Sequence, residues 1–217
     1  MIHVFYCISQ PRLEDHLYNY FFTKIPPFLQ DEISKFRNWE DRQHRVFGKL
    51  LLIKGLDILG LSDYSINRLR FTNLKRPYFD ESMDFNISHS GKYVVCAIST
   101  SAKIGIDIEE IKEIPLTDFT DQFSTDEMKN ISNADNSMHS FYSLWTKKEA
   151  FLKAIGTGLY VPLNKVHVIN NTISWKNNDW FLKELPIDND YCVHICADVL
   201  DIGVQIHEII LQDFYSN

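Results

Sequence analysis

Residues 104–109 read Ile-Gly-Ile-Asp-Ile-Glu, so isoleucine alternates with glycine or an acid without interruption. This period of two is typical of a β-strand with one apolar face. Asp107 and Glu109 then project from the same face, with Cα atoms roughly 6.5–7 Å apart. Two carboxylates at that spacing repel each other, and no cation follows them before Lys112. The pattern therefore predicts a strand whose acidic face meets either water or a bound cation.

Two long amphipathic helices are predicted, over residues 31–54 and 138–155, because each places its large apolar side chains along one stripe. Gly55 and Gly156 follow these patterns, as glycines often do where helices end. Strands are expected, from β-branched content and alternation, at residues 2–8, 66–72, 93–99, 103–109, 165–169, 191–197 and 204–211. Both halves of the chain repeat a helix followed by strands. We therefore predict an α+β fold built from a duplicated α+β unit, with lobes at residues 1–102 and 103–217.

The charge pattern favours a small anionic ligand over a nucleic acid. The 217 residues carry a formal net charge of −7, which argues against a general nucleic-acid binder. Positive charge is nevertheless concentrated in residues 35–54 and 64–79. These basic segments suit a compact anion such as a phosphate ester, and a solvated face is the alternative that charge alone leaves open.

Composition also limits the compartment in which the protein is expected. None of the four cysteines forms a C-x-x-C pair, and three lie in apolar strand-like runs, so buried reduced thiols are expected. The sequence has no apolar run of the length that spans a membrane, and its first residues lack the pattern of a signal peptide. We expect a cytoplasmic protein.

The second predicted helix places charges in and beside its apolar stripe. Lys148 falls in the middle of the stripe, and Glu149 and Lys153 lie together on its flank. Lys148 can extend its ammonium past the apolar surface, and the other two can form an ordinary i,i+4 pair. The functional alternative is that all three face a cleft. Glu149, Asp107 and Glu109 would then form a three-carboxylate site for Mg²⁺, with the lysines beside a substrate phosphate.

Residues 88–91, Ser-His-Ser-Gly, precede an apolar run and predict a tight turn. Their hydroxyl and imidazole groups can bond to nearby backbone, or they can donate to a bound anion. A serine hydrolase is disfavoured, because Ser88 and His89 are adjacent in the sequence and no G-x-S-x-G motif is present.

Three segments in this order resemble the surfactin-synthetase-activating type of 4′-phosphopantetheinyl transferase. They are FNISHSGKYVVCAIS (residues 85–99), IGIDIE (104–109) and LWTKKEAFLKAIGTGL (144–159). The resemblance extends from about Asp41 to Val168, and its W-x-x-K-E-A-x-x-K core is specific. It implies a pseudo-twofold α+β fold with the active site between two similar lobes. It also implies transfer of the phosphopantetheine arm of coenzyme A to a serine of an apo acyl or peptidyl carrier protein, with release of 3′,5′-ADP. Fatty-acid, polyketide and peptide-synthetase carriers all remain open as partners.

The resemblance carries specific roles to this chain. It implies that Asp107, Glu109 and Glu149 hold Mg²⁺ on the coenzyme A pyrophosphate, with Glu149 our first choice as general base. The residues implied to bind the coenzyme are Arg45 at the 3′-phosphate, Lys75 or Arg76 near the nucleotide, and Ser88, His89, Lys148 and Lys153. Together with Glu149, the residues Lys153 and Asp107 are the expected catalytic set. Glu127 matches a family glutamate without an assigned role. The acidic or neutral segment Phe28–Glu32 departs from the family, so Lys35 is the expected substitute there.

Two other functions are compatible with parts of the sequence. Asp107 with Glu110-Ile111-Lys112 resembles the acidic motif of metal-dependent nucleases or phosphodiesterases, but this leaves Ser88, His89 and the second helix unexplained. A non-catalytic module that binds coenzyme A or a carrier protein is the other alternative. The presence of all three expected metal carboxylates argues against it. We expect a monomer that binds no nucleic acid and no membrane.

Overall fold

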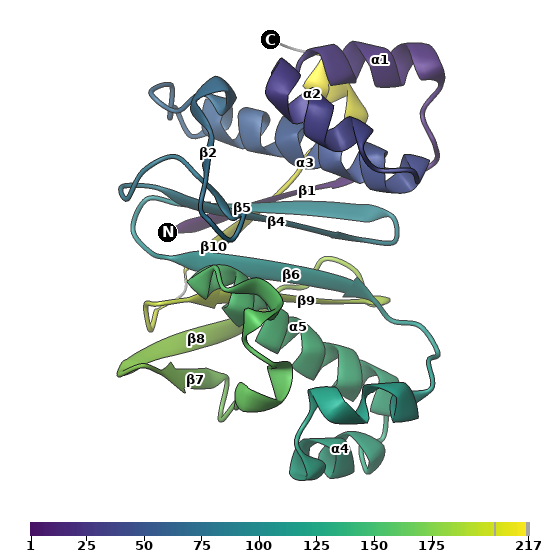
Figure 1. The fold of residues 1–217 in the computed structure, drawn as a ribbon, viewed down its shortest axis with the longest axis vertical. Coiled ribbons are helices and arrows are strands. Elements are labelled where there is room, and N and C mark those ends of the chain that lie inside the picture. Colours follow the sequence, from purple (N-terminus) through teal and green to yellow (C-terminus); the bar gives the residue numbers. More distant parts are fainter. Residues whose placement is uncertain (202, 216–217) are drawn as a thin grey trace. The chain divides into compact units, whose positions relative to one another are not determined.

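The computed structural model describes residues 1–201 and 203–215, which form two compact α+β units (Figure 1). The first unit contains Met1–Ser101 and the segment that begins at Gly203, and the second unit begins at Ala102. No helix in the described residues is long and apolar enough to cross a membrane. Each unit packs one long helix against a four-stranded sheet. This confirms the predicted α+β class.

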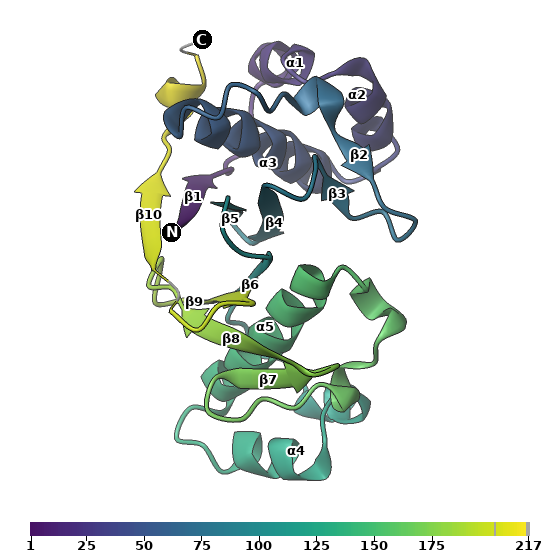
Figure 2. The same ribbon diagram turned by 90° about the vertical axis from the view of Figure 1, so that its left-hand side faces the viewer.

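The sheet of the first unit has the strand order β10-β1-β5-β4. β1 pairs parallel with β10 and antiparallel with β5, which also pairs antiparallel with β4. Helix α3 packs on this sheet, and α1 and α2 contact α3 (Figure 2). The elements are β1 (Ile2–Ile8), α1 (Asp15–Thr23), α2 (Pro27–Ser34), α3 (Trp39–Ile58), the short pair β2 (Arg70–Phe71) and β3 (Pro77–Tyr78), β4 (Asp84–Ser90), β5 (Tyr93–Ser99) and β10 (Val204–Glu208). The core between α3 and the sheet includes Phe5, Phe47, Leu51, Phe85 and Ile98, all at most 1% exposed.

The helix predicted over residues 31–54 is wrong at both ends, because α3 continues through Gly55 to Ile58. The structure ends α2 at Ser34 and begins α3 at Trp39. Asn38 caps α3 by accepting a hydrogen bond from the Glu40 N–H at 3.0 Å, and Glu40 and Asp41 lie in the first turn. Because an Asn cap and early acids favour a helix start, this local chemistry divides the apolar pattern into two helices.

The predicted tight turn at residues 88–91 is also shifted. Ser88, His89 and Ser90 belong to strand β4, and Ser90 pairs with Tyr93 across a two-residue loop. Gly91 in that loop has φ +52°, a left-handed conformation that glycine adopts without a side-chain penalty. The serine and histidine side chains are therefore presented by a strand rather than by a turn.

The sheet of the second unit has the antiparallel order β6-β9-β8-β7. Helix α5 packs against β6 and β9, and the shorter α4 contacts α5. The elements are β6 (Ile104–Glu110), α4 (Thr125–Ser132), α5 (Ser137–Ile155), β7 (Thr172–Trp175), β8 (Asn178–Glu184) and β9 (Tyr191–Ala197). Short 3₁₀ helices occur at Ile66–Arg68 and Leu211–Phe214 in the first unit, and at Leu116–Gln122, Gly158–Tyr160 and Leu163–Lys165 in the second.

Helix α5 approaches β6 at Gly105. A Cβ atom at this position would lie 2.0 Å from the Ala150 carbonyl oxygen and 2.4 Å from the Ala154 nitrogen. Only a residue without a side chain permits the helix backbone to come this close. Because side chains alternate along a strand, Asp107 and Glu109 share the Gly105 side of β6, and α5 covers this side.

Three predictions of organisation need correction. The predicted C-terminal lobe extended to residue 217, but β10 pairs with β1 in the sheet of the first unit. The strand predicted at 165–169 contains the end of a 3₁₀ helix and a loop, with one isolated bridge at Ile169. The predicted strand 66–72 contains the 3₁₀ helix Ile66–Arg68 followed by the two-residue β2.

Candidate functional site

The charged centre of the second unit is the pair formed by Asp107 on β6 and Lys153 on α5. Their Oδ1 and Nζ atoms lie 2.5 Å apart, with the Asp107 side chain 4% exposed and the Lys153 side chain 27% exposed. Buried carboxylates are rare unless they are paired, so the lysine accounts for the tolerated charge of Asp107. The acidic face of the 104–109 strand is therefore covered by a helix that supplies a cation, not by water.

Glu149 lies one turn before Lys153 on α5, and both charges of the Asp107–Lys153 pair affect its pKa. Burial raises the pKa of Glu149, the negative charge of Asp107 raises it further, and the ammonium of Lys153 lowers it. A carboxylate with a raised pKa binds protons more tightly and is a better general base near neutral pH. The structure thus brings together Asp107, Glu149 and Lys153, which the sequence placed 46 residues apart at the extremes.

Glu109 extends the acidic side of β6, where it is half-buried and pairs in register with Cys192 of β9. Within residues 1–201 and 203–215, no group of three or more histidine, cysteine, aspartate or glutamate side chains is arranged to hold a metal ion. The three-carboxylate site therefore stays a prediction. The donor chemistry still fits Mg²⁺, because carboxylate oxygens are its preferred protein ligands. The effect of Asp107 on the pKa of Glu149 also reveals local negative charge that a cation would relieve.

Lys148 makes buried contacts of its own. Its ammonium lies 2.7 Å from Oε2 of Glu127 and donates to the Leu163 carbonyl at 3.1 Å, and the residue has no exposed surface. Glu127 also accepts from the Ser124 N–H at 2.8 Å, as part of the capping box that begins α4. This pair links α4 to α5 from within the unit. The role of Lys148 in coenzyme binding is untested by these contacts and stays a prediction.

In the first unit, Ser88 and His89 occupy neighbouring positions on β4. Adjacent strand residues point to opposite faces of a sheet. Phe85 belongs to the core beneath α3, so His89 faces α3, and Ser88 faces the other side. His89 stacks its ring on His44 of α3, with centroids 4.8 Å apart. The side chains of Ser88 and His89, both predicted to bind the coenzyme, therefore lie on opposite faces of the sheet.

Arg45 follows His44 on α3. Its guanidinium carbon lies 3.7 Å from the ring centroid of Phe36, a cation–π contact that orients the side chain while leaving the residue exposed. Lys35, expected to replace missing basic residues, forms an exposed pair with Glu32. An exposed i,i+3 pair is weak, and so it does not prevent Lys35 from meeting another anion.

Lys75 and Arg76 lie in the turn between β2 and β3 and have different environments. Lys75 is exposed with φ +62°, and its N–H donates to the Thr72 carbonyl. The Nη2 atom of Arg76 lies 2.9 Å from Oδ2 of Asp84, and these side chains are 15% and 5% exposed. Because Arg76 is held by a buried carboxylate, Lys75 is the more accessible of the two predicted cations.

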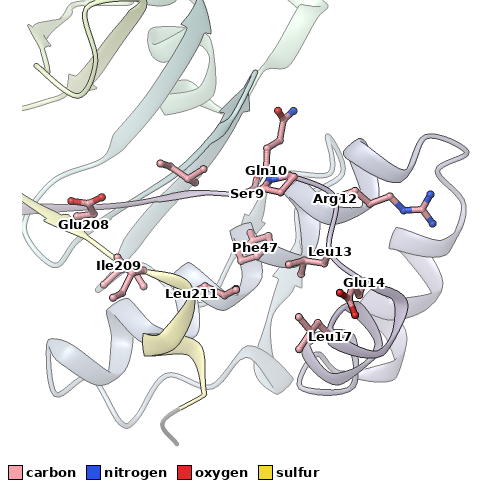
Figure 3. Close-up of a pocket in the computed structure, with 13 residues that line it drawn as sticks. Ser9, Gln10, Arg12, Leu13, Glu14, Leu17, Phe47, Glu208, Ile209 and Leu211 are labelled. Carbon is pink, nitrogen blue, oxygen red and sulfur yellow. The ribbon is translucent and has the colours of Figure 1, made fainter.

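One cavity of about 370 Å³ in the first unit lies apart from all predicted site residues. Its walls come from the end of β1, the start of α1 and the segment after β10, with Phe47 and Leu13 among the labelled side chains (Figure 3). The cavity is largely apolar and contains no cluster of catalytic groups. We assign the candidate site from the motif residues rather than from this cavity.

The sequence interpretation missed His44, which the structure buries against His89. The signal available was weak: a histidine directly before Arg45, within a helix whose buried positions are mostly apolar. A lone histidine at such a position is usually structural. Only the long-range stacking with β4 distinguishes it.

Comparison with known proteins identifies the family. The profile of the 4′-phosphopantetheinyl transferase superfamily matches residues 103–196, and the profile of the 4′-phosphopantetheinyl transferase N-terminal region matches residues 10–101. The chain is 34% identical over 184 residues to the 4′-phosphopantetheinyl transferase gsp of Aneurinibacillus migulanus, covering 82% of this chain and 77% of that protein. It is 30% identical over 188 residues to the 4′-phosphopantetheinyl transferase Sfp of Bacillus subtilis, covering 82% and 84%. The chain therefore belongs to the 4′-phosphopantetheinyl transferase family, whose enzymes transfer the phosphopantetheine arm of coenzyme A to carrier proteins.

Proposed function

We propose that this chain modifies an apo carrier protein in a Mg²⁺-dependent reaction that releases 3′,5′-ADP. The hydroxyl of a carrier serine attacks the phosphorus that bears the pantetheine arm, and the bond to 3′,5′-ADP breaks. The observation that carries this proposal is the cluster of Asp107, Lys153 and Glu149, at the family motifs on β6 and α5.

Each member of the cluster has a chemical role. Glu149 accepts the serine proton, directly or through water, because its carboxylate lies within the charged cluster of Asp107 and Lys153. Lys153 is close enough to Asp107 to exchange between this carboxylate and a pyrophosphate oxygen. Asp107, Glu109 and Glu149 would hold Mg²⁺, which when bound would neutralise the negative charge of the pyrophosphate.

Five of the proposed coenzyme-binding residues belong to the first unit. We assign Arg45 and His89 to the 3′-phosphate, because His89 faces the helix that carries Arg45. Lys75 is the cation assigned to the nucleotide, with Arg76 as its fixed neighbour, and Ser88 contributes a hydroxyl. Lys148 and Lys153 complete the predicted set. We further propose a cytoplasmic monomer that binds no nucleic acid, in keeping with its net charge of −7.

Intact-mass measurement tests this function directly. Apo acyl and peptidyl carrier proteins are incubated with coenzyme A and Mg²⁺, and a carrier that is a substrate gains about 340 Da, the mass of the transferred arm. Addition of EDTA should abolish the gain. Asp107→Asn should abolish it too, whereas Glu113→Gln, at an exposed position of the same unit, should match the unsubstituted protein. Tight binding of coenzyme A without any mass gain across a panel of carriers would instead support a binding module.

A further inference from the structure

His44 is buried in the first unit at a position where its ring contacts a predicted coenzyme residue. It is 4% exposed, and its ring lies against that of His89 with centroids 4.8 Å apart and planes inclined by 30°. His89 is only half-buried, so the pair has one face in the protein and one nearer solvent. His44 therefore forms a platform beneath His89.

The His44 ring also interacts with the loop between β4 and β5. The ring bonds to the backbone of Gly91, in the loop between β4 and β5. Its Nε2 atom is buried and has no hydrogen-bond partner among the described residues.

Burial favours the neutral form of His44. Desolvation lowers its pKa, and this outweighs the opposing effects of Glu40 and Asp41 on the same helix. A neutral ring can stack on His89 without repelling it, whether or not His89 carries a proton.

The loop that accepts the His44 bond is held to α3 by further contacts. The amide of Gln10 donates to the Gly91 carbonyl at 3.4 Å and to Glu40 near the start of α3. Gln43, 2% exposed, donates to the carbonyls of Ser9 and Pro11. The His44–His89 stack is thus next to a hydrogen-bonded segment at the start of α3, directly before Arg45.

We propose that His44 is a positioning residue for coenzyme binding, which holds the His89 imidazole in place by ring stacking. This inference rests on the proposed function and on the assignment of His89 to the coenzyme. His44 itself makes no contact with the coenzyme in this scheme. Its contribution is to reduce the side-chain freedom that His89 must lose when a phosphate binds.

Two substitutions separate the stacking from the hydrogen bond. His44→Phe keeps an aromatic ring under His89 and loses the bond to Gly91. His44→Asn keeps a side chain that can form a hydrogen bond and loses the ring. We expect His44→Asn to raise KM for coenzyme A about 10-fold, the scale of one ordered side chain and one aromatic contact, and His44→Phe to raise it about 3-fold. For both variants, kcat and KM for the carrier should stay within about 3-fold, because the chemistry resides on other residues.

A double-mutant cycle with His89→Ala provides the decisive readout. If His44 acts through His89, His44→Asn should have no further effect on KM for coenzyme A once His89 is removed. Independent, multiplicative effects in the cycle would overturn the proposal, and so would an unchanged KM in His44→Asn. Thermal melts show whether a rise in KM results from unfolding. His44→Phe is chosen to avoid unfolding, because it keeps an aromatic ring in the buried position. His16→Asn, at an exposed position on α1, is the matched control. Failure of the unsubstituted protein to modify any carrier would instead refute the proposed function, and this inference with it.

Discussion

Replacing Gly105 by alanine tests whether close contact between α5 and β6 builds the charged cluster. The added Cβ would lie 2.0 Å from the Ala150 carbonyl oxygen and 2.4 Å from the Ala154 nitrogen. Both atoms belong to helix backbone, which cannot move aside by changing a rotamer. The strand and the helix must therefore separate.

The size of this separation follows from the contact distances. Raising the shortest contact from 2.0 Å to an acceptable 3.0 Å requires about 1 Å of displacement. Overpacking of this kind costs about 3 kcal/mol, which for a protein of this size lowers Tm by about 6–12 °C. Lys153 lies one residue before Ala154, so its 2.5 Å contact with Asp107 should be lost. A displacement of about 1 Å in a catalytic site reduces turnover by on the order of 10²-fold.

Turnover is measured as mass gain of an apo carrier, and stability by circular dichroism during heating. The activity assay is run well below the Tm of the variant, so that loss of turnover reports geometry and not unfolding. Gly203→Ala is the control, because its Cβ would meet only the flexible Met1 side chain, at 3.4 Å. If Gly105→Ala melted with the unsubstituted protein and kept its turnover within about 3-fold, the argument from backbone contact would be wrong.

Three further predictions concern single side chains. Glu149→Gln should lose turnover by on the order of 10²-fold, and near-normal turnover would remove Glu149 from both proposed roles. Lys148→Met should lower the free energy of unfolding, measured in urea, by roughly 3 kcal/mol, because it leaves Glu127 without its cation. Adding Glu127→Gln should recover part of this loss. Additive losses in the double variant would contradict the pairing. Burial lowers the pKa of His194 to about 3, so the unfolded state binds one more proton between pH 6.5 and 3. Stability should therefore fall with decreasing pH in this window by up to about 1.4 kcal/mol per pH unit, and His194→Phe should show a shallower slope in pH-dependent unfolding.

Several elements were predictable because their signals are local. The strands at 2–8, 93–99 and 191–197 match β1, β5 and β9 at both ends, and each is a continuous or alternating apolar run. The end of the 138–155 helix was predictable because Gly156 adopts φ +69° as a left-handed cap. β4 was missed because its polar sequence, Asp84–Ser90, reads as a turn when its pairing with β5 is unknown.

The sequence was sufficient to predict which residues form the candidate site, but not which of them contact one another. The motifs identified Asp107, Glu149 and Lys153, and the helical spacing placed the last two on one flank. The direct pairing of Lys153 with Asp107 was not predicted, because the expected partner of the acid was a metal ion. Lys148 shows the same limit: its position in the apolar stripe was visible, but its carboxylate partner lies 21 residues earlier on another helix.

The amino-acid sequence by itself determined the α+β class, the strands β1, β5, β6 and β9, the glycine-capped end of α5, and the family, because periodicity, capping and motif spacing act over a few residues. Tertiary structure alone decided which faces meet. It decided that β10 pairs with β1 in the first sheet, that α5 covers the acidic side of β6 at Gly105, and that His44 stacks on His89. These contacts join residues far apart in the chain, and their stability comes from packing and charge pairing that no local pattern records.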